Sequence, residues 1–117
     1  MMKTCLASSV LVFSIASFAA GQTYNVLHRF DGSNGSSPTG SLLLHDGSLY
    51  GVANSGGSNY AGTIFRMDRA GNNFNVLHAF DGSSEGQAPY GGLVTDGSYL
   101  YGATPTGGTS NDGTIFR

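Results

Sequence analysis

The chain has few charged residues and almost no cysteine. Charged side chains make up 10% of its 117 residues, against about 25% in an average globular domain. The single lysine, Lys3, and the single cysteine, Cys5, both lie near the N-terminus. Residues 22–117 therefore cannot be stabilised by disulfides. Their four arginines and seven acidic residues give a net charge near −3, which disfavours binding to nucleic acid or to an anionic membrane.

Glycine and aromatic residues are abundant. The 19 glycines exceed twice the usual share, which is about 7% of residues. Seven phenylalanines and six tyrosines argue against disorder, because disordered segments are poor in aromatic residues. This composition predicts a β-rich domain with many tight turns.

Residues 1–21 predict a secretory signal peptide. Lys3 supplies the positive charge, Leu6 to Phe18 form the apolar stretch, and small residues at Ser17 and Ala19 suit signal peptidase. The alternative, a membrane anchor, needs about 18 strongly apolar residues, and serines interrupt this stretch. We therefore expect a secreted, periplasmic or cell-surface protein with no stable membrane span after cleavage.

The second half of the chain repeats the first. Tyr24–Ser33 returns as Phe74–Ser83 at a shift of 50 residues, and Gly62–Arg66 returns as Gly113–Arg117 at a shift of 51, because Tyr99 is inserted between them. A period near 50 residues indicates a tandem supersecondary unit. Residues 1–21 thus precede a first repeat over residues 22–73 and a second over residues 74–117, which ends short.

Each repeat contains short apolar runs separated by turn residues such as Asp-Gly. Runs of this length suit β-strands, and Asp-Gly between them is a strong hairpin signal. Period-two alternation predicts that Val76, His78 and Phe80 share one face of their strand. In the first repeat the predicted strands are Asn25–Phe30, Ser41–His45, Ser48–Ala53 and Thr63–Met67.

This pattern predicts an all-β fold of two propeller-like, four-stranded blade repeats, hence an incomplete β-propeller. Gly40 to Phe80 would form a complete four-stranded sheet, and Gly91 to Arg117 three strands lacking one. Tyr24 to Phe30 would be an isolated outer strand that completes the second sheet, within the chain or in a neighbour. We therefore expect self-association, or further repeats, to complete a propeller.

The repeat resembles the GloVer tandem-repeat family of exported bacterial proteins, whose repeats look like VLHxF…G…P…GL…DG…LYGxT…GG…GTxF. In the first copy the matching residues are Val26-Leu27-His28, Phe30, Pro38, Asp46-Gly47, Leu49-Tyr50-Gly51, Gly56-Gly57 and Gly62-Thr63-Ile64-Phe65. In the second they are Val76-Leu77-His78, Phe80, Pro89, Gly92-Leu93, Asp96-Gly97, Leu100-Tyr101-Gly102, Gly107-Gly108 and Gly113-Thr114-Ile115-Phe116. The resemblance implies a propeller-like fold, a surface or secreted location and no established reaction. Longer family members carry more repeats, so we expect a truncated member.

Some recurring residues are interpreted as structural. His28 and His78 could line a metal or sugar site, but each shares a predicted strand face with Val and Phe, which favours a packing role. Asp46 and Asp96 could be calcium ligands, but no D-x-D-x-D-G run accompanies them. Turn formation explains them better, and we expect no metal and no cofactor.

Two recurring pairs are the candidate ligand-binding residues. Tyr50 and Tyr101 could present an aromatic face to a ligand; the alternative is that they pack between blades while the following glycine admits a neighbouring backbone. Arg66 and Arg117 could contact a ligand or form surface ion pairs. The absence of tryptophan weakens the case for sugar binding.

These observations favour an exported, non-enzymatic repeat module for surface binding or scaffolding, with a glycan or protein as partner. One alternative is a propeller enzyme acting on polysaccharide. Asp81 and Glu85 could be its paired carboxylates, but they lie in a Gly-Ser loop and Glu85 has no equivalent in the first copy, which favours a solvated loop. A further alternative is a fragment of a longer repeat protein without independent function.

Overall fold

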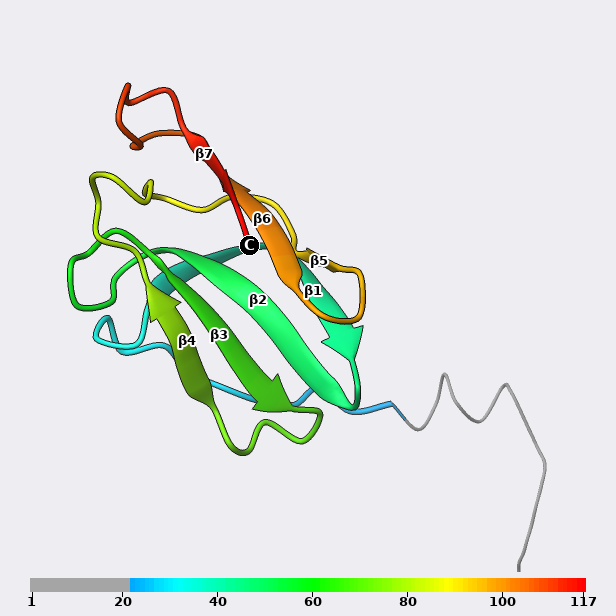
Figure 1. Cartoon of the computed structure of the whole chain (residues 1–117). Coiled ribbons are helices and arrows are strands. Elements are labelled where there is room, and N and C mark those ends of the chain that lie inside the picture. The colour runs from blue at the N-terminus through cyan, green and yellow to red at the C-terminus, as the bar shows by residue number, and fades with distance from the viewer. Residues whose placement is uncertain (1–21) are drawn as a thin grey trace, which may run out of the picture.

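The computed structural model describes residues 22–117 and is all-β, as predicted. Two antiparallel sheets contain all the described strands (Figure 1). The first sheet has the order β1 (Ser36–His45), β2 (Ser48–Ser55), β3 (Thr63–Asp68) and β4 (Asn75–Ala79). The second has the order β5 (Val94–Thr95), β6 (Leu100–Thr104) and β7 (Thr114–Phe116). The described residues include no helix that could cross a bilayer.

The first sheet confirms the predicted unit from Gly40 to Phe80. Asp46 and Gly47 join β1 to β2 with positive φ angles of 48° and 75°, as a tight hairpin turn requires. The Asp68 carboxylate organises the turn between β3 and β4 by accepting hydrogen bonds from the amides of Ala70 and Asn72. Turn residues that can be recognised in the sequence therefore determine the β1–β2 and the β3–β4 connections.

Tyr24–Phe30 is not a strand, so that prediction was wrong. The outer edge of β3 is already paired with β4. The segment lies instead against a face of the first sheet, where the Phe30 ring meets the Phe65 ring edge-on at a centroid distance of 5.1 Å.

The predicted common face of β4 is also wrong. A register shift places Val76 opposite Phe65 and His78 opposite Ile64. Because Phe65 and Ile64 are adjacent on β3, their partners point to opposite faces of the sheet. The shift turns His78 away from Val76 and towards the second sheet.

The first sheet is covered on both sides. Segment Tyr24–Phe30 lies on the Phe65 face, whereas the second sheet stacks on the face that carries Ile64 (Figure 1). Gly40 and Gly91 touch where the two sheets join, since a Cβ on Gly40 would overlap the Gly91 carbonyl. The buried apolar side chains are Val52, Ala53, Ala61, Phe65, Met67, Phe80 and Leu93. The sheets form two stacked layers and do not close into a ring.

Candidate functional site

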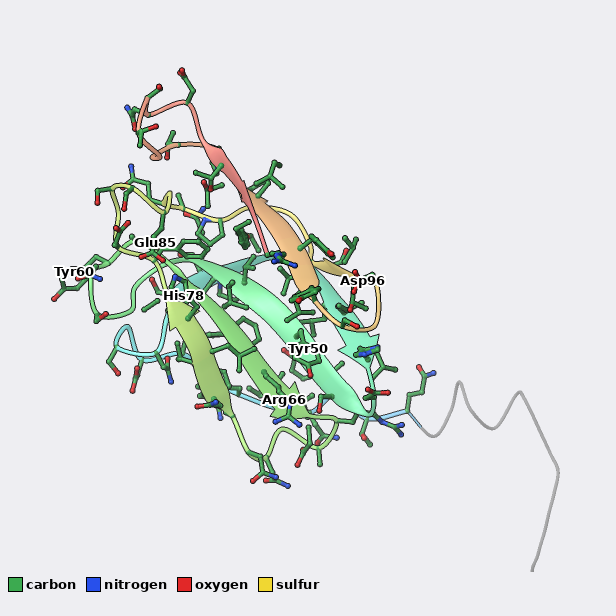
Figure 2. All side chains as sticks on the ribbon, in the orientation of Figure 1. Tyr50, Tyr60, Arg66, His78, Glu85 and Asp96 are labelled. Carbon is green, nitrogen blue, oxygen red and sulfur yellow. The ribbon has the colours of Figure 1, made fainter. Side chains whose placement is uncertain are left out.

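The first-repeat candidates Tyr50 and Arg66 are neighbours. They are register partners on β2 and β3, so their side chains share the face that is turned to the second sheet. Arg66 Nε donates a hydrogen bond to Ser48 Oγ at 3.2 Å. Figure 2 shows the two residues close together, with His78 and Glu85 farther along towards the loop that carries Tyr60.

The second-repeat candidates are held by local contacts. The Tyr101 hydroxyl donates to the Asp96 carboxylate at 2.8 Å, which raises the pKa of Tyr101 above its ordinary value of 10.0. The amides of Tyr99 and Ser98 and the Tyr101 hydroxyl lower the pKa of Asp96 below 3.8. The Arg117 guanidinium lies 4.1 Å from the centre of the Tyr99 ring, in cation–π contact.

A cleft of about 300 Å³ between the sheets brings some of these residues together. Its lining residues are His45, Asp46, Tyr50, Thr95, Gly97, Ser98, Tyr99 and Leu100. The cleft thus pairs Tyr50 with Tyr99, and not with its repeat counterpart Tyr101. Sequence reasoning missed Tyr99 as a site residue; its insertion in the second copy was the available signal.

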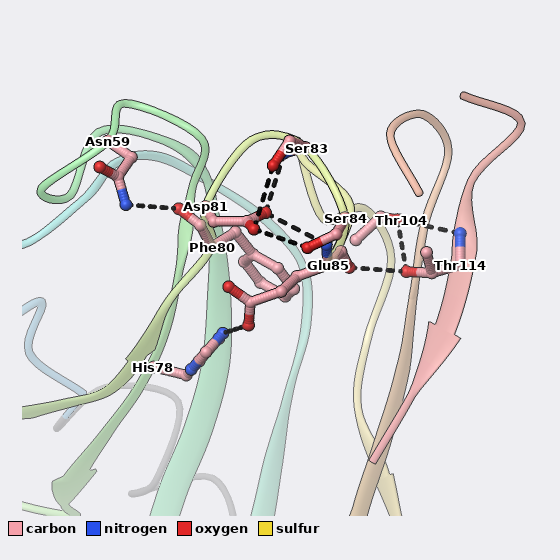
Figure 3. Close-up of polar contacts among 9 residues, drawn as sticks. All are labelled: Asn59, His78, Phe80, Asp81, Ser83, Ser84, Glu85, Thr104 and Thr114. Carbon is pink, nitrogen blue, oxygen red and sulfur yellow. Dashed lines mark hydrogen bonds and ion pairs between the residues drawn. The ribbon is translucent and has the colours of Figure 1, made fainter. Parts of the chain in front are cut away.

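A larger cavity of about 680 Å³ also lies between the sheets. Ile64, Leu77, Leu93 and Phe116 contribute apolar surface to its walls. Its polar rim includes His78, whose Nε2 lies 2.6 Å from a Glu85 carboxylate oxygen (Figure 3). Both side chains remain over two-fifths exposed, so this contact contributes little to stability.

His28, the counterpart of His78, packs among aromatic rings. It stacks on Phe74 with a centroid distance of 3.6 Å and meets Phe30 edge-on at 4.8 Å. Its Nε2 lies 3.2 Å from Asn34 Nδ2. Nowhere in residues 22–117 do three or more His, Cys, Asp or Glu side chains gather as metal ligands would.

Asp81 and Glu85 point to different partners. The Asp81 carboxylate accepts hydrogen bonds from the amides of Ser83 and Glu85 and from the hydroxyls of Ser83 and Ser84 (Figure 3). These bonds, the Ser83 amide first, lower its pKa to about 2 against a weaker opposing effect of desolvation. The Glu85 carboxylate is directed to His78. Each carboxylate is thus engaged by a different set of partners, Asp81 by the turn and Glu85 by His78.

The strands, turns and aromatic contacts that recur at the repeat period define an all-β tandem-repeat protein. The sequence matches the family model of the Gloeobacter/Verrucomicrobia repeat over residues 10–117, and the chain belongs to that family. This confirms the resemblance found in the sequence. No curated protein and no solved structure matches the chain.

Proposed function

We propose that this protein is an exported, non-enzymatic repeat module that binds a glycan or protein at the cell surface, or scaffolds other components there. Membership of the repeat family and the all-β architecture support this proposal. The two sheets would correspond to neighbouring blades of a propeller. The polar groups that a hydrolase would need are engaged in turns and local pairs, which also favours binding over catalysis.

The cleft between the sheets carries the proposal. Tyr50 and Tyr99 line it with aromatic surface, and the neighbouring Asp46 carboxylate is 87% exposed and can accept hydrogen bonds. Aromatic side chains combined with a few polar groups suit a sugar ring or a polar peptide side chain. Such a cleft between two repeats would select its ligand by contacts from both.

Binding to isolated cell envelopes and to a glycan panel tests the proposal. We expect saturable binding that Tyr50→Ala and Tyr99→Ala each weaken about tenfold, a typical loss for an aromatic contact. Tyr60→Ala is the matched control, because Tyr60 is 82% exposed and lies outside the cleft. Absence of saturable binding to every glycan and envelope fraction would reject the recognition role, and release of reducing ends from a bound polysaccharide would reject the non-enzymatic one.

Mass spectrometry of the exported fraction tests the location. Cleavage by signal peptidase after Ala19 or Gly21 should give a mature N-terminus at Ala20 or Gln22. These positions concern residues 1–21, which lie outside the described part of the chain. Uncleaved protein that stays in the cytosol would contradict export.

A further inference from the structure

We propose that the outer edge of β7 binds Tyr24–Phe30 of a second copy of this chain, which adds to the second sheet as its fourth strand. This inference goes beyond the proposed surface role, because it identifies a partner and a pairing register. It rests on the internal repeat, which shows the same contact already made once within the chain.

Tyr24–Phe30 is the repeat counterpart of the segment that forms β4, and its rings already occupy equivalent places. Phe30 meets Phe65 edge-on at 5.1 Å, and Phe80 meets Phe116 edge-on at 5.2 Å. His28 is also edge-on to Phe30, with a centroid distance of 4.8 Å, and His78 is edge-on to Phe80 at 5.2 Å. The unpaired segment therefore lies on the first sheet as the β4 segment lies on the second.

Backbone contacts after the two segments agree. The Gly57 amide donates to the Gly32 carbonyl at 2.9 Å, and the Gly108 amide donates to the Ser83 carbonyl at 2.6 Å. The Thr63 hydroxyl donates to the Asn34 carbonyl at 3.3 Å, as Thr114 does to Glu85 at 3.1 Å. Tyr24–Phe30 is thus held in the place that a fourth strand of a preceding sheet would occupy, so binding needs no refolding.

The chain offers a matching edge. In the described residues β7 pairs only with β6, whereas its counterpart β3 also pairs with β4. An unpaired strand edge readily accepts another strand. Transferring the pairing of β3 with β4 to β7 predicts Arg117 opposite Asn25 of the second copy. The remaining predicted pairs, β7 residue first, are Thr114 with Arg29, Ile115 with His28 and Phe116 with Val26.

The larger cavity fits the side chains of this added strand. In the first repeat, Phe74 stacks on His28 and Val76 faces Phe65. By repeat equivalence, Tyr24 of the second copy would stack on His78, which lines the cavity with its side chain 44% exposed. Tyr24 is 91% exposed in the single chain, so the contact would cover apolar surface on both copies.

The outer face of the second sheet supports the same partner. Ile115 on this face is 82% exposed, whereas its counterpart Ile64 lies under the second sheet. Val94, the partner of Tyr101 in the register of β5 and β6, is 64% exposed on the same face. Within the chain, the second sheet comes after β4 in the sequence and stacks on the Ile64 face of the first sheet. In the same way, the first sheet of the second copy comes after its Tyr24–Phe30 segment and would stack on the Ile115 face of the second sheet.

Light scattering tests the association. The protein is expressed from the full sequence and purified after the expressing cell has removed the predicted signal peptide. We expect a mass above that of one chain, and Tyr24→Ala should weaken association by roughly tenfold or more, because it removes a stacked ring. Tyr60→Ala should leave the mass unchanged. A monomer at all concentrations, an oligomer that Tyr24→Ala leaves intact, or a longer natural protein in which a further repeat occupies β7 would each overturn the proposal.

Cysteine cross-linking tests the register. In a Cys5→Ala background, Asn25→Cys with Arg117→Cys should form a disulfide between copies, because directly opposed residues on paired strands lie within disulfide reach. Asn25→Cys with Ser110→Cys is the control, since Ser110 is also exposed but lies in the loop before β7, away from the predicted partner of Asn25. Equal cross-linking in both variants, or none in the first, would contradict the pairing. The association tests change Tyr24, Asn25 and Arg117, whereas the ligand-binding test changes Tyr50 and Tyr99. The association proposal and the ligand-binding proposal can therefore fail independently.

Discussion

The glycines that follow the recurring tyrosines make room for aromatic rings. A Cβ on Gly51 would lie 2.6 Å from Cζ of Phe65, and one on Gly102 would lie 2.5 Å from Cζ of Phe116. The sequence suggested close approach at these glycines, but by a neighbouring backbone. The approaching group is a side chain of the next strand, so the Leu-Tyr-Gly and Gly-Thr-Ile-Phe motifs are two halves of one packing contact.

Gly51→Ala should therefore destabilise the fold. Its Cβ would displace the buried Phe65 ring, and overpacking of this kind costs about 1–3 kcal/mol. Gly92→Ala is the matched control, because the nearest atom to its added Cβ, the Ser41 carbonyl oxygen, is at an ordinary 3.4 Å. Neither glycine requires a positive φ. Chemical denaturation should give a lower free energy of unfolding for Gly51→Ala alone, and equal stability of both variants would contradict the packing account.

The Asp81 turn should make stability depend on pH in the acidic range. Its pKa falls from 3.8 to about 2 on folding, so the ionised form stabilises the folded state. This contribution is present above pH 4 and is lost as the pH falls towards 2. Asp81→Asn should be less stable than the wild type at neutral pH, with a gap that narrows below pH 4. Asp112→Asn, in an exposed loop, is the control; a gap that is constant between pH 6 and pH 2 would contradict this role.

At the scale of elements, the sequence predicted those features that depend on neighbouring residues in the chain. The turn at Asp46-Gly47 and the four-stranded unit from Gly40 to Phe80 follow from turn residues and short apolar runs. Tyr24–Phe30 and Phe74–Phe80 have nearly the same sequence, yet only the second contains a strand. The two segments differ in the strand edge next to them. Phe74–Phe80 pairs with the edge of β3, whereas Tyr24–Phe30 pairs with no described strand of its own chain. Strand formation there depends on tertiary context, which repeat periodicity does not contain.

The candidate site was also harder to predict, because its geometry depends on contacts between segments that are distant in the sequence. Tyr50, a candidate ligand-binding residue in the sequence, lines the smaller cleft, but its companion Tyr99 comes from the other sheet. The His78–Glu85 pair depends on the register shift in β4 and on a loop that differs between the copies. A single register shift reverses which face a side chain occupies, and alternation in the sequence cannot reveal it.

For the whole molecule, the proposed contact is head-to-tail. The donor segment Tyr24–Phe30 and the acceptor strand β7 are different surfaces, so every copy that binds one neighbour can bind another. Such interfaces form closed rings when the rotation between copies closes, and open fibres when it does not. A low net charge offers little repulsion against either outcome.

Ring closure is the expected outcome. Propellers close with about 4–8 blades. If the two sheets of each chain are blades, as proposed above, three chains would give a six-bladed ring in which every β7 edge is paired. We expect sedimentation and light scattering to show one species of about three chains that stops growing as concentration rises, and Tyr24→Ala to shift it to monomer. Growth without limit would indicate an open fibre with the same contact. A monomer that unfolds in a sharp cooperative transition would instead show that the two stacked sheets are a self-sufficient β-sandwich, and would rule out both assemblies.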